Sequence, residues 1–235
     1  MVTIDDIKIA DLGFYINLDK RTDRKEHLLK NLEEYNIIGV ERKSAREDDK
    51  TVQLNLINSN FDLYKYFLST DAETLLILED DCKFLPSIKQ NTKEIFDNIH
   101  NTDWDLFWLG GVNRKPPIPY KNKCYQVSSV SYTQSFIIKR KMAEDVLKTF
   151  EPNWYNLGID EMLCLFAYGI DVAKDPFGKN FYNIDQPLNH FKTEYKCLCY
   201  ESSFTTQYNS YSDLLHYETD LETWLPLHHP TSKSW

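Results

Sequence analysis

Three consecutive carboxylates follow an apolar run in the stretch LLILEDDCKF, residues 75–84. In an extended segment, Glu79 and Asp81 point to one side and Asp80 points to the other. Adjacent carboxylates repel one another, and a hard divalent cation such as Mn²⁺ or Mg²⁺, which prefers oxygen ligands, would relieve that repulsion. The motif could therefore bind a metal. The alternative is a solvated acidic turn in which Asp80 caps a helix.

A second acidic pair, Asp160 and Glu161, lies in the stretch IDEML, residues 159–163. A carboxylate beside a reacting hydroxyl can act as a general base and take its proton. The alternative is that Asp160 caps a following helix while Glu161 is a solvated acid of its first turn.

The first eighty residues alternate between two periodicities. The apolar run 13–18 predicts a strand, and residues 22–36 carry leucines at helical spacing behind Thr22 or Asp23 as N-cap. Residues 37–41 predict a second strand, 59–69 a second helix and 75–79 a third strand. This βαβαβ order implies a parallel sheet with helices on its faces. Ligands bind beyond the carboxyl ends of such strands, which is where the acidic motif falls.

The remaining pattern predicts a helix over 87–99, a strand over 105–110 and a basic, proline-containing loop over 111–123. Strands are expected around 124–130 and 135–139, followed by helices over 141–150 and 160–169. From about residue 180 the chain is polar and rich in tyrosine, and we assign no regular element to it.

Length and composition restrict the protein class. The 235 residues, 42% hydrophobic, predict one compact domain, and the net charge of −9 opposes wholesale wrapping by nucleic acid or adhesion to anionic lipid. No apolar run approaches the ~20 residues of a membrane span, and the first residues are acidic where a secretory leader is basic, so we expect a cytoplasmic protein. The motifs GxSxG, GxGxxG, GxxxxGK[ST] and HExxH do not occur in the sequence.

The stretch FYINLDKRTDR, residues 14–24, resembles the opening motif of glycosyltransferase family twenty-five, the lipopolysaccharide and collagen glycosyltransferases. Later blocks follow the family's order over roughly residues 13–165: ERKSA, LLILEDD, WDLFWLGG, SYTQSFIIKRKMAEDVL and IDEML. The resemblance implies a GT-A-like, single Rossmann-type α/β domain, 1–235, with a mostly parallel central sheet and helices on both faces. Residues 13–110 would bind the nucleotide sugar, 111–179 would hold the acceptor and catalytic groups, and 180–235 would form an irregular tail.

The resemblance also implies a reaction: inverting transfer of a sugar from a nucleotide-diphosphate donor, expected to be a UDP-sugar, to a hydroxyl of a glycan or protein. A bound Mn²⁺ or Mg²⁺ would stabilise charge on the leaving phosphate. Asp81 would be the direct ligand, Glu79 a ligand or a support for one, and His190 a third ligand, although a lone histidine is more often structural. Asp160 would be the base. The donor would contact Asn17, Asp19, Arg21, Arg24, Ser44 and Asp80; for the two arginines, the alternative is a solvated helix start.

The chain departs from the family pattern on the acceptor side. Asn55 and Asn60 stand where the family has a glycine and a histidine, and Gln134 matches a further histidine. Three hypotheses follow: a glycosyltransferase acting on a glycan or protein, the same donor chemistry directed at a modified nucleic-acid base, and a catalytically silent sugar- or nucleotide-binding module. The basic loop from Arg114 to Lys123 motivates the second, and the intact acidic motif argues against the third.

Overall fold

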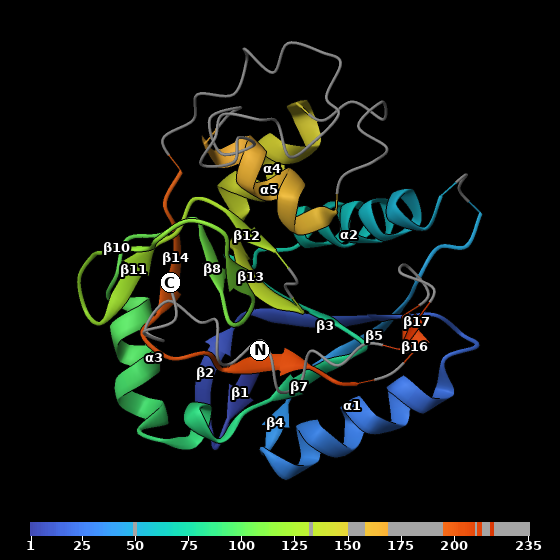
Figure 1. Cartoon of the computed structure of the whole chain (residues 1–235), viewed down its shortest axis with the longest axis horizontal. Helices are drawn as coiled ribbons and strands as arrows, with labels where there is room; N and C mark the ends of the chain where they lie inside the picture. Colours follow the sequence, from blue (N-terminus) through green and yellow to red (C-terminus); the bar gives the residue numbers. More distant parts are fainter. Residues whose placement is uncertain are drawn as a thin grey trace.

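A computed structural model gives the fold of the chain and describes residues 1–48, 51–131, 134–149, 158–168, 195–209, 211–212 and 217–218. Its centre is an eight-stranded sheet with the strand order β10-β11-β14-β8-β13-β6-β3-β5 (Figure 1). The strands β5, β3 and β6 are parallel neighbours, whereas β13 and β11 run opposite to the strands beside them, so the sheet is mixed. In sheet order the strands are Ile118–Pro119, Cys124–Gln126, Cys197–Tyr200, Leu106–Trp108, Ser135–Lys139, Thr74–Glu79, Leu12–Asn17 and Glu41–Ser44.

The predicted βαβαβ unit is confirmed: β3 leads into α1 (Thr22–Glu34), β5, α2 (Val52–Leu68) and β6. The register pairs Asn17 with Ser44 across β3 and β5, and Ile16 with Glu79 across β3 and β6. The carboxyl ends of these three strands therefore meet at one edge of the sheet, and the acidic motif follows the last of them.

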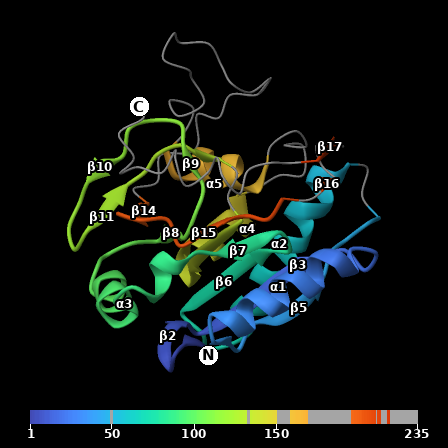
Figure 2. The same ribbon diagram turned by 60° about the horizontal axis from the view of Figure 1, so that its bottom comes forward.

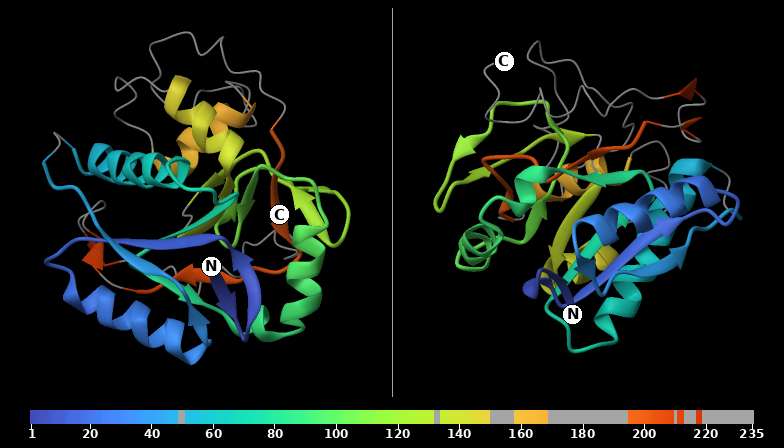
Figure 3. Two further views of the ribbon diagram at one scale, coloured as in Figure 1. Left: turned by 180° about the vertical axis from the view of Figure 1, so that it is seen from behind. Right: turned by 90° about the horizontal axis from the view of Figure 1, so that it is seen from below.

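Helices cover both faces of the sheet, as predicted. On one face, α1 and α3 (Thr92–His100) pack into one apolar cluster together with β1 (Val2–Ile4), β2 (Ile7–Ala10) and β4 (Ile37–Ile38), which form a small second sheet. On the other face, α2, α4 (Arg140–Thr149) and α5 (Ile159–Tyr168) pack into a second cluster. The reverse view shows α2 and α1 on opposite sides of β3 (Figure 3). Alternate residues of β6 supply the two clusters, which is the period-two pattern of a strand buried on both faces.

Some element boundaries differ from the prediction. The strand predicted over 37–41 is divided at Gly39, whose φ of +82° favours glycine and whose Cβ would lie 2.2 Å from the carbonyl oxygen of Met1. The N-cap of α1 is Arg21, not Thr22 or Asp23. The helix predicted over 87–99 is a 3₁₀ turn, Pro86–Lys89, followed by α3, because Asn91 between them is left-handed with φ 64°.

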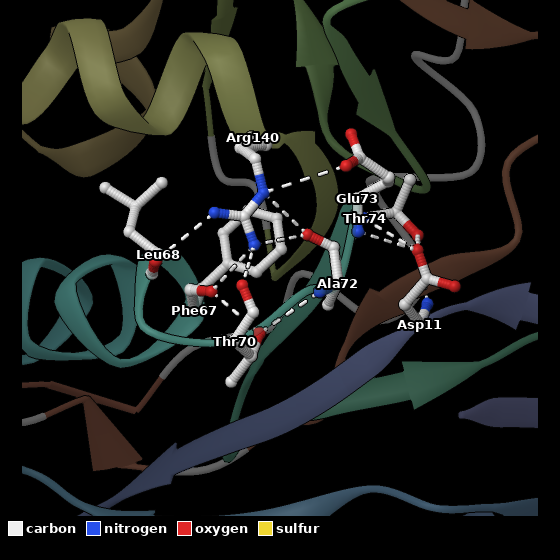
Figure 4. A network of polar contacts seen from close by, with 8 residues as sticks. All are labelled: Asp11, Phe67, Leu68, Thr70, Ala72, Glu73, Thr74 and Arg140. Carbon is white, nitrogen blue, oxygen red and sulfur yellow. Dashed lines mark hydrogen bonds and ion pairs between the residues drawn. The ribbon is translucent and has the colours of Figure 1, made fainter.

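The C-terminal end of α2 is held by Arg140, the first residue of α4 (Figure 4). Carbonyls at a helix end lack partners within the helix, and the Arg140 guanidinium supplies donors to them. Its carbon Cζ also lies 5.1 Å from the ring centroid of Phe67. The acceptors are the main-chain oxygens of Phe67 at 3.2 Å, Leu68 at 3.3 Å, Ala72 at 2.8 Å and Thr70.

Asp11 caps the start of β6 in the same region (Figure 4). Its Oδ2 accepts hydrogen bonds from the main-chain amides of Glu73 at 3.0 Å and Thr74 at 2.9 Å. Although partial burial acts against ionisation, the Lys8 ammonium and these donors lower the pKa of Asp11. The carboxylate therefore stabilises the fold in its ionised form.

The prediction that residues 180–235 form an irregular tail is wrong where the structure describes that range, because it contains four short strands. Residues 197–200 form β14, which lies inside the central sheet between β8 and β11. Residues 205–207 form β15, which pairs with β7 (Cys82–Phe84) beside the acidic motif. Both strands are short and fully buried, so neither shows an alternating pattern in the sequence. Short pairs are also formed by β9 (Val112–Asn113) with β12 (Val130–Ser131), and by β16 (Tyr211–Ser212) with β17 (Tyr217–Glu218).

No helix within the described ranges combines the length and the apolar character needed to cross a bilayer.

Candidate active site

The acidic motif is a buried turn between β6 and β7. Asp80 is 7% exposed and Asp81 is 3% exposed. The strand β7 begins directly after them at Cys82, so Asp80 does not cap a helix. The alternative of a solvated acidic turn is therefore wrong. Buried carboxylates need compensating donors or cations, and the surrounding residues supply some of these.

Arg24 is the counter-ion of the motif. Its Nη1 lies 2.9 Å from Asp80 Oδ1 and 3.0 Å from Asp81 Oδ2, and the residue is only 8% exposed. Burial disfavours the charged guanidinium, but the two carboxylates outweigh this and raise the pKa of Arg24. Asn17, the last residue of β3, completes the contacts of Asp80 by donating from Nδ2 to Oδ2 at 2.8 Å.

Asp81 is held from the opposite side by the C-terminal part of the chain. Its Oδ2 accepts a hydrogen bond from Gln207 Nε2 at 2.9 Å, and its main-chain oxygen accepts one from the amide of Tyr208 at 2.6 Å. Its Oδ1 is buried and has no hydrogen-bond partner in the part of the chain that the structure describes. Burial is the largest influence on this carboxyl and raises its pKa to about 6, although Arg24 acts in the opposite direction.

Glu79 and Asp160 belong to the same electrostatic site. Burial, followed by the charges of Asp81, Asp160 and Asp80, raises the pKa of Glu79 well above its usual range, even though the residue keeps some exposed surface. The effect of the Asp160 charge on Glu79 indicates that the start of α5 lies near the end of β6. Asp160 is the second residue of α5, so it is not the N-cap of that helix. The main-chain oxygen of Gln134 accepts a hydrogen bond from the Glu79 amide at 2.8 Å.

A polar network lines the ends of β3 and β5. Ser44 Oγ donates to Asp19 Oδ1 at 2.9 Å, and Arg42 pairs with Asp19 while its Nε donates to Asn17 Oδ1 at 3.0 Å. Arg21 forms two hydrogen bonds with Asp23, at 2.9 and 2.7 Å, which lower the Asp23 pKa to about 2.

The structure thus brings the residues that were predicted to bind the nucleotide sugar to one edge of the sheet. Their contacts with a nucleotide sugar stay a prediction.

Whether the site suits a divalent cation can be judged from the carboxylate oxygens that it presents. Asp81 offers a buried oxygen that has no hydrogen-bond partner among the described residues, and Glu79 offers a neighbouring carboxylate whose ionisation is opposed by burial and then by like charge. Oxygen ligands of this kind suit Mn²⁺ or Mg²⁺. Across the described residues, however, no group of three or more His, Cys, Asp or Glu side chains is arranged to hold a metal. The predicted third ligand, His190, lies outside the described residues, as does the side chain of Glu161.

Four residues of the site were not predicted from the sequence. Arg42 stands two residues before Ser44 on the same strand, so strand alternation could have identified it. Gln207 carried no such signal, because it lies 126 residues from its partner Asp81. The rings of His27 and Tyr208 stack with centroids 3.5 Å apart and an interplanar angle of 15°, which joins α1 to the C-terminal segment.

No protein-family model matches the chain. It is 25% identical to human procollagen galactosyltransferase 2 over a 233-residue alignment that covers 85% of this chain and 36% of that protein. It is 22% identical to procollagen galactosyltransferase 1 of Danio rerio over 214 residues, covering 77% of this chain and 33% of that protein. The chain therefore spans about a third of the length of these curated relatives.

Among solved structures, A197 from STIV matches with a TM-score of 0.46 and 14% identity, covering 85% of both chains. A glycosyltransferase involved in the glycosylation of the major capsid of PBCV-1 matches with a TM-score of 0.42 and 12% identity, covering 67% of this chain and 74% of the other. Both TM-scores are below 0.5, so these two likenesses carry no argument for function.

Proposed function

We propose that the chain is a GT-A-like glycosyltransferase that moves a sugar from a nucleotide-diphosphate donor to a hydroxyl group. The observation that carries the proposal is the buried acidic motif at the carboxyl end of β6, where Asp81 Oδ1 receives no hydrogen bond from the described residues and the charges of Asp81 and Asp160 act on Glu79. Ligands of open α/β sheets bind at this edge. The sequence similarity to proteins named galactosyltransferases supports the same conclusion.

The donor we propose is a UDP-sugar, with UDP-galactose first because the relatives are named for galactose transfer. Arg21, the N-cap of α1, and Arg42, on β5, could exchange their carboxylate partners for phosphate or uracil oxygens. Asn17 and Ser44 offer neutral groups for the ribose or base. Asp19, whose side chain is 71% exposed, is accessible to ligand hydroxyls.

We propose Mn²⁺ or Mg²⁺ as the cofactor, held by Asp81 and Glu79, with His190 as the third protein ligand. When bound, the cation would stabilise the negative charge that develops on the leaving phosphate. Arg24 already balances part of the charge of Asp80 and Asp81. The chain therefore holds the carboxylates together before a ligand enters, which is the preorganisation that electrostatic catalysis requires.

Asp160 is the proposed general base. Inversion by a single displacement needs a group that takes the proton of the acceptor hydroxyl as its oxygen attacks the anomeric carbon. The proton passes to the Asp160 carboxylate, and the bonding pair of the glycosidic bond leaves with the nucleotide diphosphate. Asp160 is partly exposed and acts electrostatically on Glu79, so it lies near the motif and is accessible to an acceptor. Glu161 follows it on α5 and is the alternative base.

We propose a glycan or protein hydroxyl as the acceptor. A nucleic-acid acceptor was suggested by the basic loop, but the structure neutralises part of that charge. Lys123 pairs with Glu94 at 2.9 Å and lies 3.6 Å from Glu201. These ion pairs leave less positive charge for phosphates to contact.

The proposal is tested by measuring the thermal stability of the protein with nucleotide sugars, with and without Mn²⁺, beside the variant Asp81→Asn. A ligand at about 100 times its Kd stabilises a protein by about 2.7 kcal/mol. We expect stabilisation by one UDP-sugar that needs Mn²⁺ and is lost in Asp81→Asn. The anomeric configuration of the product, read by NMR, then tests inversion. Absence of stabilisation by every nucleotide sugar would refute the proposal.

A further inference from the structure

A C-terminal segment, residues 203–208, runs past the acidic motif, and we call it the C-terminal strap. The amide of Phe204 donates to the carbonyl of Leu109 at 2.8 Å, which joins the strap to the end of β8. Its central part is β15, which lies beside β7 (Figure 2). The two strands pair antiparallel, with Gln207 opposite Cys82. The strap therefore places a strand from a distant part of the sequence beside the acidic motif.

Packing fixes the strap in place. Phe204, Thr205 and Thr206 are completely buried, and Thr205 Oγ1 shares a hydrogen bond of 2.6 Å with Ser135 Oγ on β13. A Cβ on Gly110 would lie 2.3 Å from Thr205 Oγ1 and 2.5 Å from Thr205 O, so only glycine permits this close approach. At the far end, the stack of Tyr208 on His27 attaches the strap to α1.

From this geometry we propose that Gln207 is a positioning residue for Asp81, which it orients toward the divalent cation; the inference rests on the proposed function. Two donors contact the same carboxylate oxygen: Gln207 Nε2 at 2.9 Å and Arg24 Nη1 at 3.0 Å from Oδ2. The other oxygen, Oδ1, is buried and receives no hydrogen bond from the described residues. Donors on one oxygen set the rotation of the carboxylate and leave the second oxygen for a metal ligand bond.

A glutamine side chain suits this role because it is neutral. Its amide donates a hydrogen bond but adds no positive charge that would repel an incoming cation, as a second arginine or a lysine would. Gln207 is 9% exposed, so solvent competes little for its donor. The amide of Tyr208 holds the Asp81 main chain as well, so the strap orients both the backbone and the side chain of this residue.

The test measures Mn²⁺ affinity of the full chain by electron paramagnetic resonance, which needs no donor or acceptor. The variant Gln207→Met keeps the approximate length of the side chain and removes the donor. Loss of such a supporting hydrogen bond typically weakens metal binding 10–100-fold, and we expect a rise in Kd of about that size. The matched control is Thr205→Val, which removes the contact with Ser135 from the same strap without touching Asp81. We expect it to lower the Tm while leaving the Kd for Mn²⁺ unchanged.

Each outcome decides the inference. Wild-type affinity in Gln207→Met overturns it, and so does equal weakening in both variants, because the packing of the strap would then be responsible instead of the amide. If wild-type protein binds no Mn²⁺, the metal in the proposed function is wrong and the role of Gln207 falls with it. Should Gln207→Met fail to fold, Gln207→Asn keeps a polar amide that is one methylene too short and is expected to weaken Mn²⁺ binding in the same direction.

Discussion

Replacing Arg24 by methionine should strongly destabilise the metal-free protein. The Arg24 guanidinium lies 2.9 Å from Asp80 and 3.0 Å from Asp81, and all three side chains are at most 10% exposed. Methionine preserves much of the side-chain volume, so the substitution chiefly removes charge and hydrogen bonds. Two buried carboxylates then lose the cation that forms ion pairs with both of them, beside a third carboxylate at Glu79.

The magnitude follows from these distances. At an effective dielectric constant of about 20, a unit charge pair about 3 Å apart gains roughly 5 kcal/mol. Part of this gain is offset in the wild-type protein by the cost of burying the charged Arg24 guanidinium, and the variant no longer bears that cost. Measured losses on removing one partner of a buried pair are about 3–5 kcal/mol, and we expect Arg24→Met to fall in this range near neutral pH.

The loss of stability in Arg24→Met should depend on pH. Asp81 has a pKa of about 6 in the folded protein and an ordinary value of 3.8, so its ionisation opposes folding. That destabilisation is absent below the ordinary value and is complete above the folded pKa. The Arg24 guanidinium stabilises the fold through its ion pairs only while Asp80 and Asp81 are ionised. The difference in stability between wild type and Arg24→Met should therefore be large at about pH 7.5 and smaller at about pH 4.5.

Urea unfolding in the presence of a chelator measures these differences. The matched control is Arg46→Met, because Arg46 makes a two-fold contact with Asp62 at 2.9 and 2.8 Å but is 37% exposed. An exposed pair contributes about 0.2–1 kcal/mol. The double variant Arg24→Met/Asp81→Asn should lose less than Arg24→Met alone. If Arg24→Met costs no more than Arg46→Met, or costs the same at both pH values, Arg24 is not the counter-ion of the motif.

Four further predictions follow from the site and the fold. Asp81→Asn should raise the Tm of the chelator-treated protein at neutral pH, because it removes a carboxylate whose ionisation opposes folding, while abolishing Mn²⁺ binding in a calorimetric titration. Asp160→Asn should lower kcat by about 10²–10⁴-fold in a sugar-transfer assay and leave the donor Kd unchanged, and an equal loss of donor binding would contradict its role as base. Arg140→Met should cost about 2–3 kcal/mol in urea unfolding, because the carbonyls at the end of α2 lose a charged donor. Asp11→Asn should make the free energy of unfolding less dependent on pH in the acid range. The pKa of Asp11 is lowered in the folded state, so the wild-type protein loses the stability that this carboxylate contributes as the pH falls through the folded pKa, whereas the variant lacks that contribution at every pH. An acid-unfolding series measures the difference.

The N-terminal half of the fold was predictable because its signals are local. The leucines of α1 recur at helical spacing, and β3 and β6 are apolar runs long enough to identify. Once the βαβαβ order is known, the parallel-sheet rule places the ends of β3, β5 and β6 at one edge. The position of Asp81 relative to Asn17 and Arg24 therefore follows from residues within one contiguous part of the chain.

The other half of the site could not be predicted, for a physical reason. β14 and β15 contain four and three residues and are buried on all sides, so they carry no alternation that separates them from a loop. Their positions are determined by partners far along the chain, such as β8 for β14 and β7 for β15. Tertiary pairing, which no local pattern encodes, brings Gln207 to Asp81.

The charge balance of the motif connects its stability to its proposed activity. Asp81, Asp160 and Asp80 act electrostatically on Glu79, whereas Arg24 is the one cation that the described contacts place within hydrogen-bond distance of the acidic motif. Burial, followed by repulsion from the neighbouring carboxylates, raises the pKa of Glu79, and burial also raises the pKa of Asp81 although Arg24 acts in the opposite direction; the ionised forms of both carboxyls are therefore destabilised in the metal-free site. A divalent cation would bind those same ionised forms, so its binding energy includes the relief of that repulsion. The repulsion that helps to weaken the metal-free fold thus also contributes to its affinity for the metal, and metal affinity should rise with pH over the range in which the stability of the metal-free protein falls.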